Sequence, residues 1–178
     1  MSKLSPWSEW LDVCLLRRPP QDVPYSPRLT RDMVILSVVI DAVVALMAGR
    51  DSSLALVLLS LLFLLLMPWL FLNSVGRVQR YPQTLAALAG TGVLFGLALM
   101  PAVLAWNEAG PLEQGDTPNA MHVAAYFLQL GLSAWRLLVL AHILRHAMEV
   151  RLFAASLFAL GWFILELSAS VWLFSSTQ

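Results

Sequence analysis

The 178-residue sequence predicts an all-α membrane protein: a bundle of five transmembrane helices preceded by an interfacial amphipathic helix. Three observations predict it: an apolar composition, five apolar stretches of near-membrane length, and an uneven distribution of Lys and Arg between loops. Hydrophobic residues make up 59% of the chain, charged residues make up 12%, and the mean hydropathy is +0.74. Soluble domains are roughly 45–50% apolar and about 25% charged. The composition therefore excludes soluble and disordered proteins, and the zero net charge gives no reason to expect a nucleic-acid partner.

Residues 1–31 are expected to form a cytoplasmic amphipathic helix and a Pro-rich connector. Ser5 and Pro6 suit the N-cap and first position of a helix. Large apolar residues then recur at helical spacing, namely Trp7, Trp10, Leu11, Cys14 and Leu15. An apolar helix face that contains tryptophan favours the headgroup boundary of a membrane, so we expect membrane lipids as its partners.

Residues 32–178 are expected to form the transmembrane bundle. A helix needs about 20 apolar residues to cross the roughly 30 Å hydrocarbon core. Five stretches approach this length, namely 33–48, 54–72, 84–106, 120–144 and 152–174. The first is short and contains Asp41. An alternative with four spans, in which the first stretch lies in the membrane interface, therefore remains open.

The orientation follows from the cytoplasmic bias of Lys and Arg in short loops. Basic residues concentrate in the amino-terminal tail and in the loops after the second and fourth spans, whereas Arg50 stands alone on the opposite side. All three basic segments lie on one side only if the number of spans is odd. We therefore expect a cytoplasmic amino terminus and an external carboxy terminus.

Three ionisable residues interrupt the spans: Asp41, Arg136 and Glu166. Because a charge in hydrocarbon costs about 2.5–3.5 kcal/mol even on the lenient insertion scale, such residues usually face the bundle interior and pair. Asp41 and Arg136 lie roughly 14 and 12 Å from the cytoplasmic edge, at 1.5 Å per residue. We therefore expect them to form an ion pair, which would make the first and fourth spans neighbours.

The fourth span also carries a polar strip, because one helix face contains His122, Tyr126, Gln129, Ser133 and Arg136. Glu166 is expected nearly level with Gln129. Three interpretations remain open for this polar network. It holds the helices together, it lines a crevice for an ion, proton, quinone or lipid headgroup, or it contacts a transmembrane helix of another protein.

The third span carries a small-residue face formed by Ala89, Gly92 and Gly96. Small residues let another backbone approach closely. The pattern indicates packing within the bundle or, alternatively, association with a second copy or another membrane protein.

Reactive chemistry finds little support in the sequence. His142, His146 and Glu149 share a helix face, but the His-Glu-x-x-His pattern of zinc proteases is missing, and interfacial polar residues are the simpler interpretation. There is no Gly-x-Ser-x-Gly elbow, no phosphate-binding loop and only one cysteine. We therefore expect neither a metal nor a cofactor, and we expect no enzyme activity.

The layout resembles small bacterial members of the Yip (Ypt-interacting protein) family. The resemblance rests on the short cytoplasmic tail, the connector Pro19-Pro20-Gln21-Asp22-Val23-Pro24-Tyr25-Ser26-Pro27 and the five hydrophobic spans. It implies a non-enzymatic membrane protein that acts through partners, such as assembly or trafficking factors. Together with the charge distribution, it leads us to expect a location in the bacterial inner membrane with the carboxy terminus in the periplasm.

The expected function is an accessory or scaffold subunit of the inner membrane that packs against other integral membrane proteins and assists assembly of a larger complex. The alternative is a small transporter, or a proton- or ion-coupled carrier, that uses Asp41, Arg136 and Glu166. An oligomer of the chain could then form the pathway.

Overall fold

The structure is a computed structural model that describes residues 6–22, 26–49, 53–112 and 117–175. Within these ranges every regular element is helical and there is no strand. The elements are α1 (Pro6–Cys14), η1 (Pro20–Asp22), α2 (Pro27–Met47), α3 (Ser53–Ser74), η2 (Val78–Arg80), α4 (Tyr81–Ala109), α5 (Ala120–Met148) and α6 (Leu152–Ser175).

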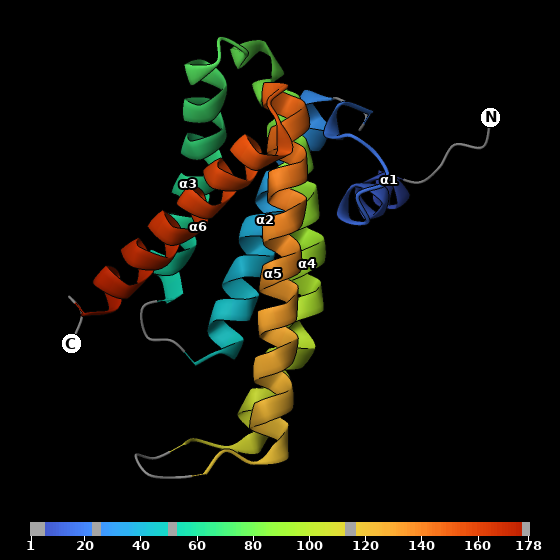
Figure 1. Ribbon diagram of the computed structural model, residues 1–178. Coiled ribbons are helices and arrows are strands. Elements are labelled where there is room, and N and C mark those ends of the chain that lie inside the picture. The colour runs from blue at the N-terminus through green and yellow to red at the C-terminus, as the bar shows by residue number, and fades with distance from the viewer. Residues whose placement is uncertain (1–5, 23–25, 50–52, 113–116, 176–178) are drawn as a thin grey trace.

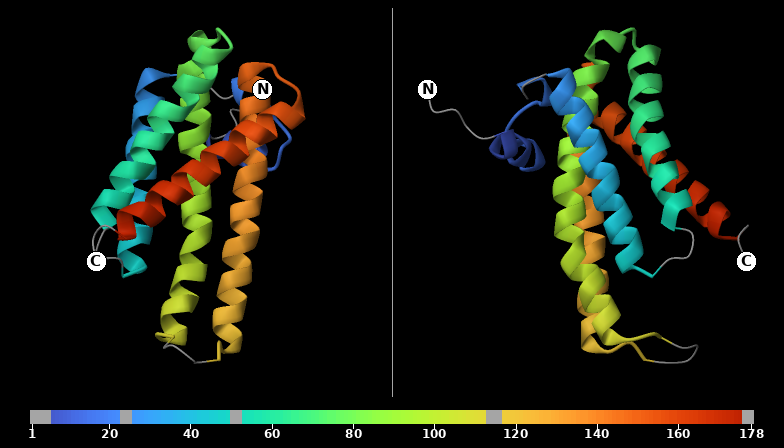
Figure 2. Two further views of the ribbon diagram at one scale, coloured as in Figure 1. Left: turned by 60° about the vertical axis from the view of Figure 1, so that its left-hand side comes forward. Right: turned by 180° about the vertical axis from the view of Figure 1, so that it is seen from behind.

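The helices form two groups (Figure 1). The first contains a long antiparallel pair, α4 and α5, together with α2. α4 and α5 pack along each other, and α2 packs on the other side of α4. α3 and α6 form the second group, in which α6 slants away from α5 so that its carboxyl end lies beside the start of α3 (Figure 2). Residues of α3, α4, α5 and α6 together line the first of the cavities that make up the candidate site.

Four helical segments of the described chain are long and apolar enough to cross a membrane: 54–74, 78–109, 120–148 and 152–173. They agree closely with the last four predicted spans, so the all-helical membrane class is confirmed. α2 is not among them, and the predicted count of five is not matched. The physical reason is that the apolar part of α2 is short, because its first turns include Arg31 and Asp32, its middle contains Asp41 and it ends at Met47.

The early start of α2 also changes the expected domain boundary. Ser26 takes the extended N-cap conformation and Pro27 the first helical position. The predicted boundary at residue 31 therefore falls inside a helix.

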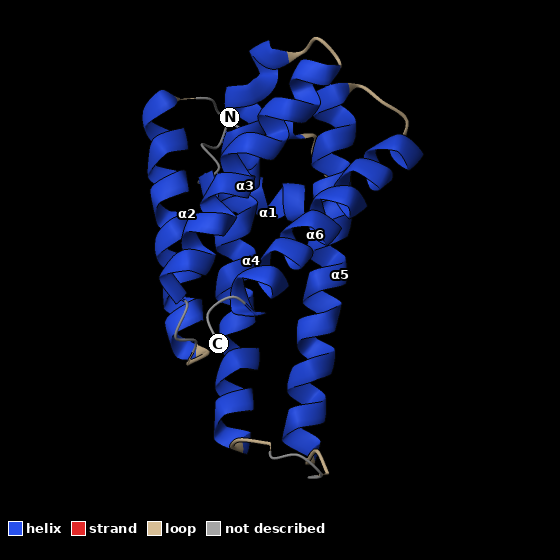
Figure 3. Cartoon of the chain, turned by 90° about the vertical axis from the view of Figure 1, so that its left-hand side faces the viewer, coloured by secondary structure: helices blue, strands red, loops and turns tan. Residues whose placement is uncertain are grey.

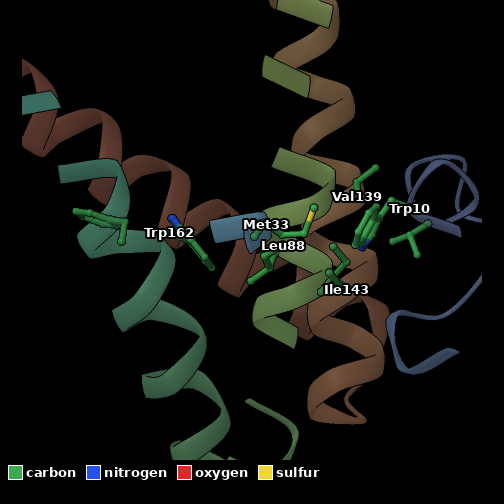
Figure 4. Packing of buried hydrophobic residues seen from close by; sticks show 10 residues of the cluster. Trp10, Met33, Leu88, Val139, Ile143 and Trp162 are labelled. Carbon is green, nitrogen blue, oxygen red and sulfur yellow. The ribbon is translucent and has the colours of Figure 1, made fainter. Parts of the chain in front are cut away.

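The amino-terminal helix forms as predicted, but it packs on protein. α1 contacts α4 and α5, and the side chains of Trp10, Val13 and Cys14 are buried against them. Trp10 lies in the main core cluster beside Val139 (Figure 4). The side chains of these three α1 residues therefore contact protein, whereas contact with membrane lipids was expected. The sequence pattern showed that this helix has an apolar face. It could not show that α4 has small residues at the place where this face packs.

Candidate functional site

The polar residues of the spans line two adjoining cavities between the helices. The first, called the Arg136 cavity, has a volume of about 240 Å³, and the second, called the Asp41 cavity, has a volume of about 530 Å³. Glu166 and Ser170 of α6 line both, so the two cavities meet at this helix. Ligand pockets commonly range from about 300 to 1,000 Å³, so the Asp41 cavity alone is large enough for a small molecule.

The Arg136 cavity is mostly apolar and has one polar wall. α5 contributes Ser133 and Arg136 to it, and α6 contributes Glu166 and Ser170. Aliphatic and aromatic side chains of α3, α4, α5 and α6 make up most of the remaining wall. This cavity therefore contains one cationic and one anionic side chain.

The Asp41 cavity is more polar and collects residues from five helices. Asp41 comes from α2, Ser60 from α3, and Tyr126 and Gln129 from α5. α4 adds Trp106 and Asn107 beside the shared residues of α6. The two carboxylates of the predicted polar network thus line the same cavity, and Glu166 meets Gln129 there as their depths suggested.

Each carboxylate accepts a hydrogen bond from a neutral donor. Ser60 Oγ donates to Asp41 Oδ2 at 3.0 Å, and Trp162 Nε1 donates to Glu166 Oε2 at 3.1 Å. Ser170 Oγ donates to the Glu166 backbone carbonyl at 2.7 Å. Within the described ranges, no Lys, Arg or His nitrogen lies within 4.0 Å of either carboxylate. Both side chains are therefore oriented without a direct counter-charge.

The expected ion pair between Asp41 and Arg136 is not formed. No guanidinium nitrogen of Arg136 lies within 4.0 Å of a carboxylate oxygen of Asp41. Each of the two residues lines a different cavity. α4 lies between α2 and α5 and packs on both, so the inferred first and fourth spans are not neighbours (Figure 3). Equal depth along two helices says nothing about which helices stand side by side, and this missing information explains the error.

His122 lies apart from the rest of the polar strip. It is buried where α4 and α5 join, and its ring nitrogens lie 2.9 Å from Asn119 Oδ1 and 3.0 Å from the Gly110 carbonyl oxygen. The ring also makes an edge contact with Trp106 at a centroid distance of 5.0 Å. His122 therefore fastens the α4–α5 connection and lines neither cavity.

The small residues of α4 have three different environments. Ala89 is fully buried, and Gly96 faces α2 so closely that a Cβ atom would lie 2.4 Å from Ile40 Cγ2. Gly92 has no atom within 4 Å of such a Cβ atom and lines the Arg136 cavity. Close packing therefore involves Gly96 and also Gly90, which the sequence pattern did not single out.

Gly90 receives the amino-terminal helix. A Cβ atom at this position would lie 2.4 Å from Trp10 Nε1. Trp135 Nε1 donates to the Cys14 carbonyl oxygen at 3.0 Å, and His142 Nε2 lies 3.1 Å from the Arg18 carbonyl oxygen. Of the predicted interfacial residues, Leu11 and Leu15 are exposed, whereas the Trp7 side chain lies outside the described part of the chain.

A cluster of charges joins the two turns at the other end of the bundle. Glu149 pairs with Arg77 at 2.5 Å and also with Arg80, whose guanidinium donates to the His146 carbonyl oxygen at 3.1 Å. Partial desolvation would raise the pKa of Glu149, but the hydrogen bonds and charges of the two arginines lower this pKa below its ordinary value. His142 and His146 contact each other with ring centroids 4.4 Å apart. No group of three His, Cys, Asp or Glu residues in the described chain is placed to hold a metal ion.

Several cavity residues were missed from the sequence. Ser60 is the only hydroxyl residue within the leucine-rich stretch 54–72, and this isolation was a usable signal. Trp106 and Asn107 gave no such signal, because they lie at the end of the predicted third span, where tryptophan is an ordinary interfacial residue. Trp162 gave none either, because a tryptophan within an apolar span does not stand out as polar.

Comparisons with known proteins do not assign the chain to a family, because no family model, curated protein or solved structure matches it.

Proposed function

We propose that the chain crosses the bacterial inner membrane five times, with α2 as the first span and the amino terminus in the cytoplasm. α2 has 21 residues, which at 1.5 Å per residue gives about 31 Å, and it packs along α4. The arginines of the α3–α4 and α5–α6 turns then face the cytoplasm together, and the ion pairs of Glu149 with Arg77 and Arg80, which join these two turns, support placing them on one side. This topology fits the Yip-like layout of the sequence.

The chain acts as a non-enzymatic accessory subunit that packs against another integral membrane protein. One observation carries this proposal: Arg136 is exposed in the middle of α5, with no carboxylate within 4.0 Å in the described chain. A charge left uncovered inside a span is costly, so membrane proteins almost always neutralise it with a partner. A partner helix that carries an Asp or Glu at the same depth would do so.

The neighbouring residues of α5 support the same surface. Gln129 and Tyr126 are also exposed, about two and three turns from Arg136 toward the outer end of the helix. Side-chain hydrogen bonds between membrane helices contribute about 0.6–2 kcal/mol each. An exposed polar strip with one cation therefore selects a polar partner helix over lipid.

Site-specific photo-crosslinking tests the accessory function. A photoreactive residue replaces Gln129, which is exposed about two turns from Arg136 on the same face of α5, and the crosslinked products are identified after gentle extraction from cells. We expect one membrane protein to be captured in stoichiometric amount, and we expect Arg136→Gln to abolish this product. Arg145→Gln, which removes an exposed charge two to three turns along the same helix, is the matched control and should leave the product intact. Products unchanged by Arg136→Gln would contradict the proposal.

The second candidate is a small proton- or ion-coupled carrier. The observation that favours it is that Asp41 and Glu166 line one cavity without a cation beside either carboxylate. Flux into liposomes that contain only this protein, abolished by Glu166→Gln, is the result expected of a carrier. If the partner protein is captured but no flux is measured, the accessory function is supported and the carrier function is contradicted.

A further inference from the structure

The Asp41 cavity has an excess of negative charge. Asp41 and Glu166 both line it, and no Lys or Arg does so among its described residues. Even with Arg136 of the adjoining cavity included, two carboxylates stand against one guanidinium. One carboxylate therefore has no arginine to match it in the two cavities, and a monovalent cation would balance the pair when both carboxylates are ionised.

The wall of the cavity favours an organic cation over a bare metal ion. Hard metal ions require several oxygen ligands at short range, whereas here each carboxylate is held on a separate helix by a neutral donor. The rings of Trp106 and Tyr126 line the same cavity, and the wall between the polar groups consists of Leu and Val side chains of α2, α3 and α4. Aromatic faces attract quaternary and protonated amines through their ring quadrupoles.

We propose that the Asp41 cavity binds a lipophilic monovalent organic cation, such as a protonated amine or a quaternary onium compound, with its charge between Asp41 and Glu166. The aromatic rings and aliphatic side chains contact the apolar groups of the ligand. The volume of about 530 Å³ accommodates a molecule of this class. The inference concerns binding alone and is independent of the partner surface around Arg136.

Equilibrium dialysis of the full chain in detergent against radiolabelled tetraphenylphosphonium tests the inference. Tetraphenylborate, which has nearly the same shape but the opposite charge, is the matched probe. We expect saturable binding of one phosphonium per chain and at least about tenfold weaker binding of the borate. Equal binding of the two ions would overturn the proposal, because the carboxylates would then play no part.

Two carboxylate variants locate the site. Asp41→Asn and Glu166→Gln should each weaken phosphonium binding at least about tenfold, since each removes one of the charges that hold the cation. Glu108→Gln removes an exposed carboxylate on α4, outside the cavity lining, and should bind as the unaltered protein does. Full binding by both cavity variants would also overturn the proposal.

A variant that fills the Asp41 cavity with a larger side chain tests the proposal even if a carboxylate variant fails to fold. Gln129→Trp leaves both carboxylates in place and adds bulk from an exposed position at the cavity wall. It should reduce binding of phosphonium at least about tenfold while thermal unfolding remains close to that of the unaltered protein. A folded Gln129→Trp protein with unchanged affinity would contradict binding in this cavity.

Discussion

Gly90 is the residue that admits the amino-terminal helix to the bundle. Because a Cβ atom there would lie 2.4 Å from Trp10 Nε1, we expect Gly90→Ala to displace Trp10 and to destabilise the protein by about 1–3 kcal/mol. Limited trypsin digestion at the Arg17–Arg18 pair should become faster. Gly92→Ala is the matched control two residues away, because its Cβ atom would meet nothing within 4 Å. It should leave the digestion rate unchanged and stabilise the helix slightly.

The reactivity of the Cys14 thiol reports on the packing of α1 against α4 and α5. Burial raises the pKa of its thiol to about 12, so at pH 8 only about one molecule in 10⁴ carries the reactive thiolate. We expect maleimide labelling of the folded protein to be very slow and that of the denatured protein to be fast. Trp10→Ala should restore fast labelling without denaturant. Rapid labelling of the unaltered protein would show that α1 does not occupy its position on α4 and α5.

The turns at one end of the bundle depend on the Glu149 cluster. Since Arg80 and Arg77 lower the pKa of Glu149 in the folded state, this residue adds stability above its ordinary pKa of 4.5, and that stability is lost as the pH falls through the lowered value. Thermal unfolding in detergent from pH 7 to pH 3 should show a steeper acid loss for the unaltered protein than for Glu149→Gln. Identical pH profiles would contradict a role for the ion pairs, and Glu108→Gln controls for a change in net charge.

The elements could be predicted more completely than their arrangement. Apolar length and helix-ending residues placed four helices within a few residues of their observed bounds, because these signals are local. The position of α4 between α2 and α5 left no such signal, so the pairing of Asp41 with Arg136 was wrong. Pairing depends on which faces of which helices meet, and similar leucine-rich surfaces leave this undetermined.

The candidate site was predictable as a set of residues but not as a geometry. The cost of a charge in hydrocarbon singled out Asp41, Arg136 and Glu166, and all three line the two cavities. His122 followed the same helical spacing, yet it fastens the α4–α5 connection instead. Spacing identifies one helix face, whereas the slant of α6 decides which part of that face borders a cavity.

Whether the two ends of the chain lie on opposite sides of the membrane or on the same side depends on whether α2 crosses it. With five spans, a reporter fused after Gln178 should lie outside the cytoplasm, while a reporter before Met1 should lie inside. Paired alkaline phosphatase and fluorescent-protein fusions measure both positions. Activity of the phosphatase fusion only at the amino terminus would reverse the orientation, and two cytoplasmic ends would mean that α2 does not cross.

The binding position of α1 has a consequence for biosynthesis. This helix leaves the ribosome first, but the residues that receive it belong to α4 and α5, where Gly90 accommodates Trp10 and Trp135 donates to the Cys14 carbonyl. Gly90 is made when about half of the 178 residues have been translated, and Trp135 when about three-quarters have been. The nascent amino-terminal segment must therefore wait, with its tryptophan unprotected, until the late hairpin is inserted. The contact of α1 with α4 and α5 therefore forms late, and its formation distinguishes the assembled chain from the unassembled one.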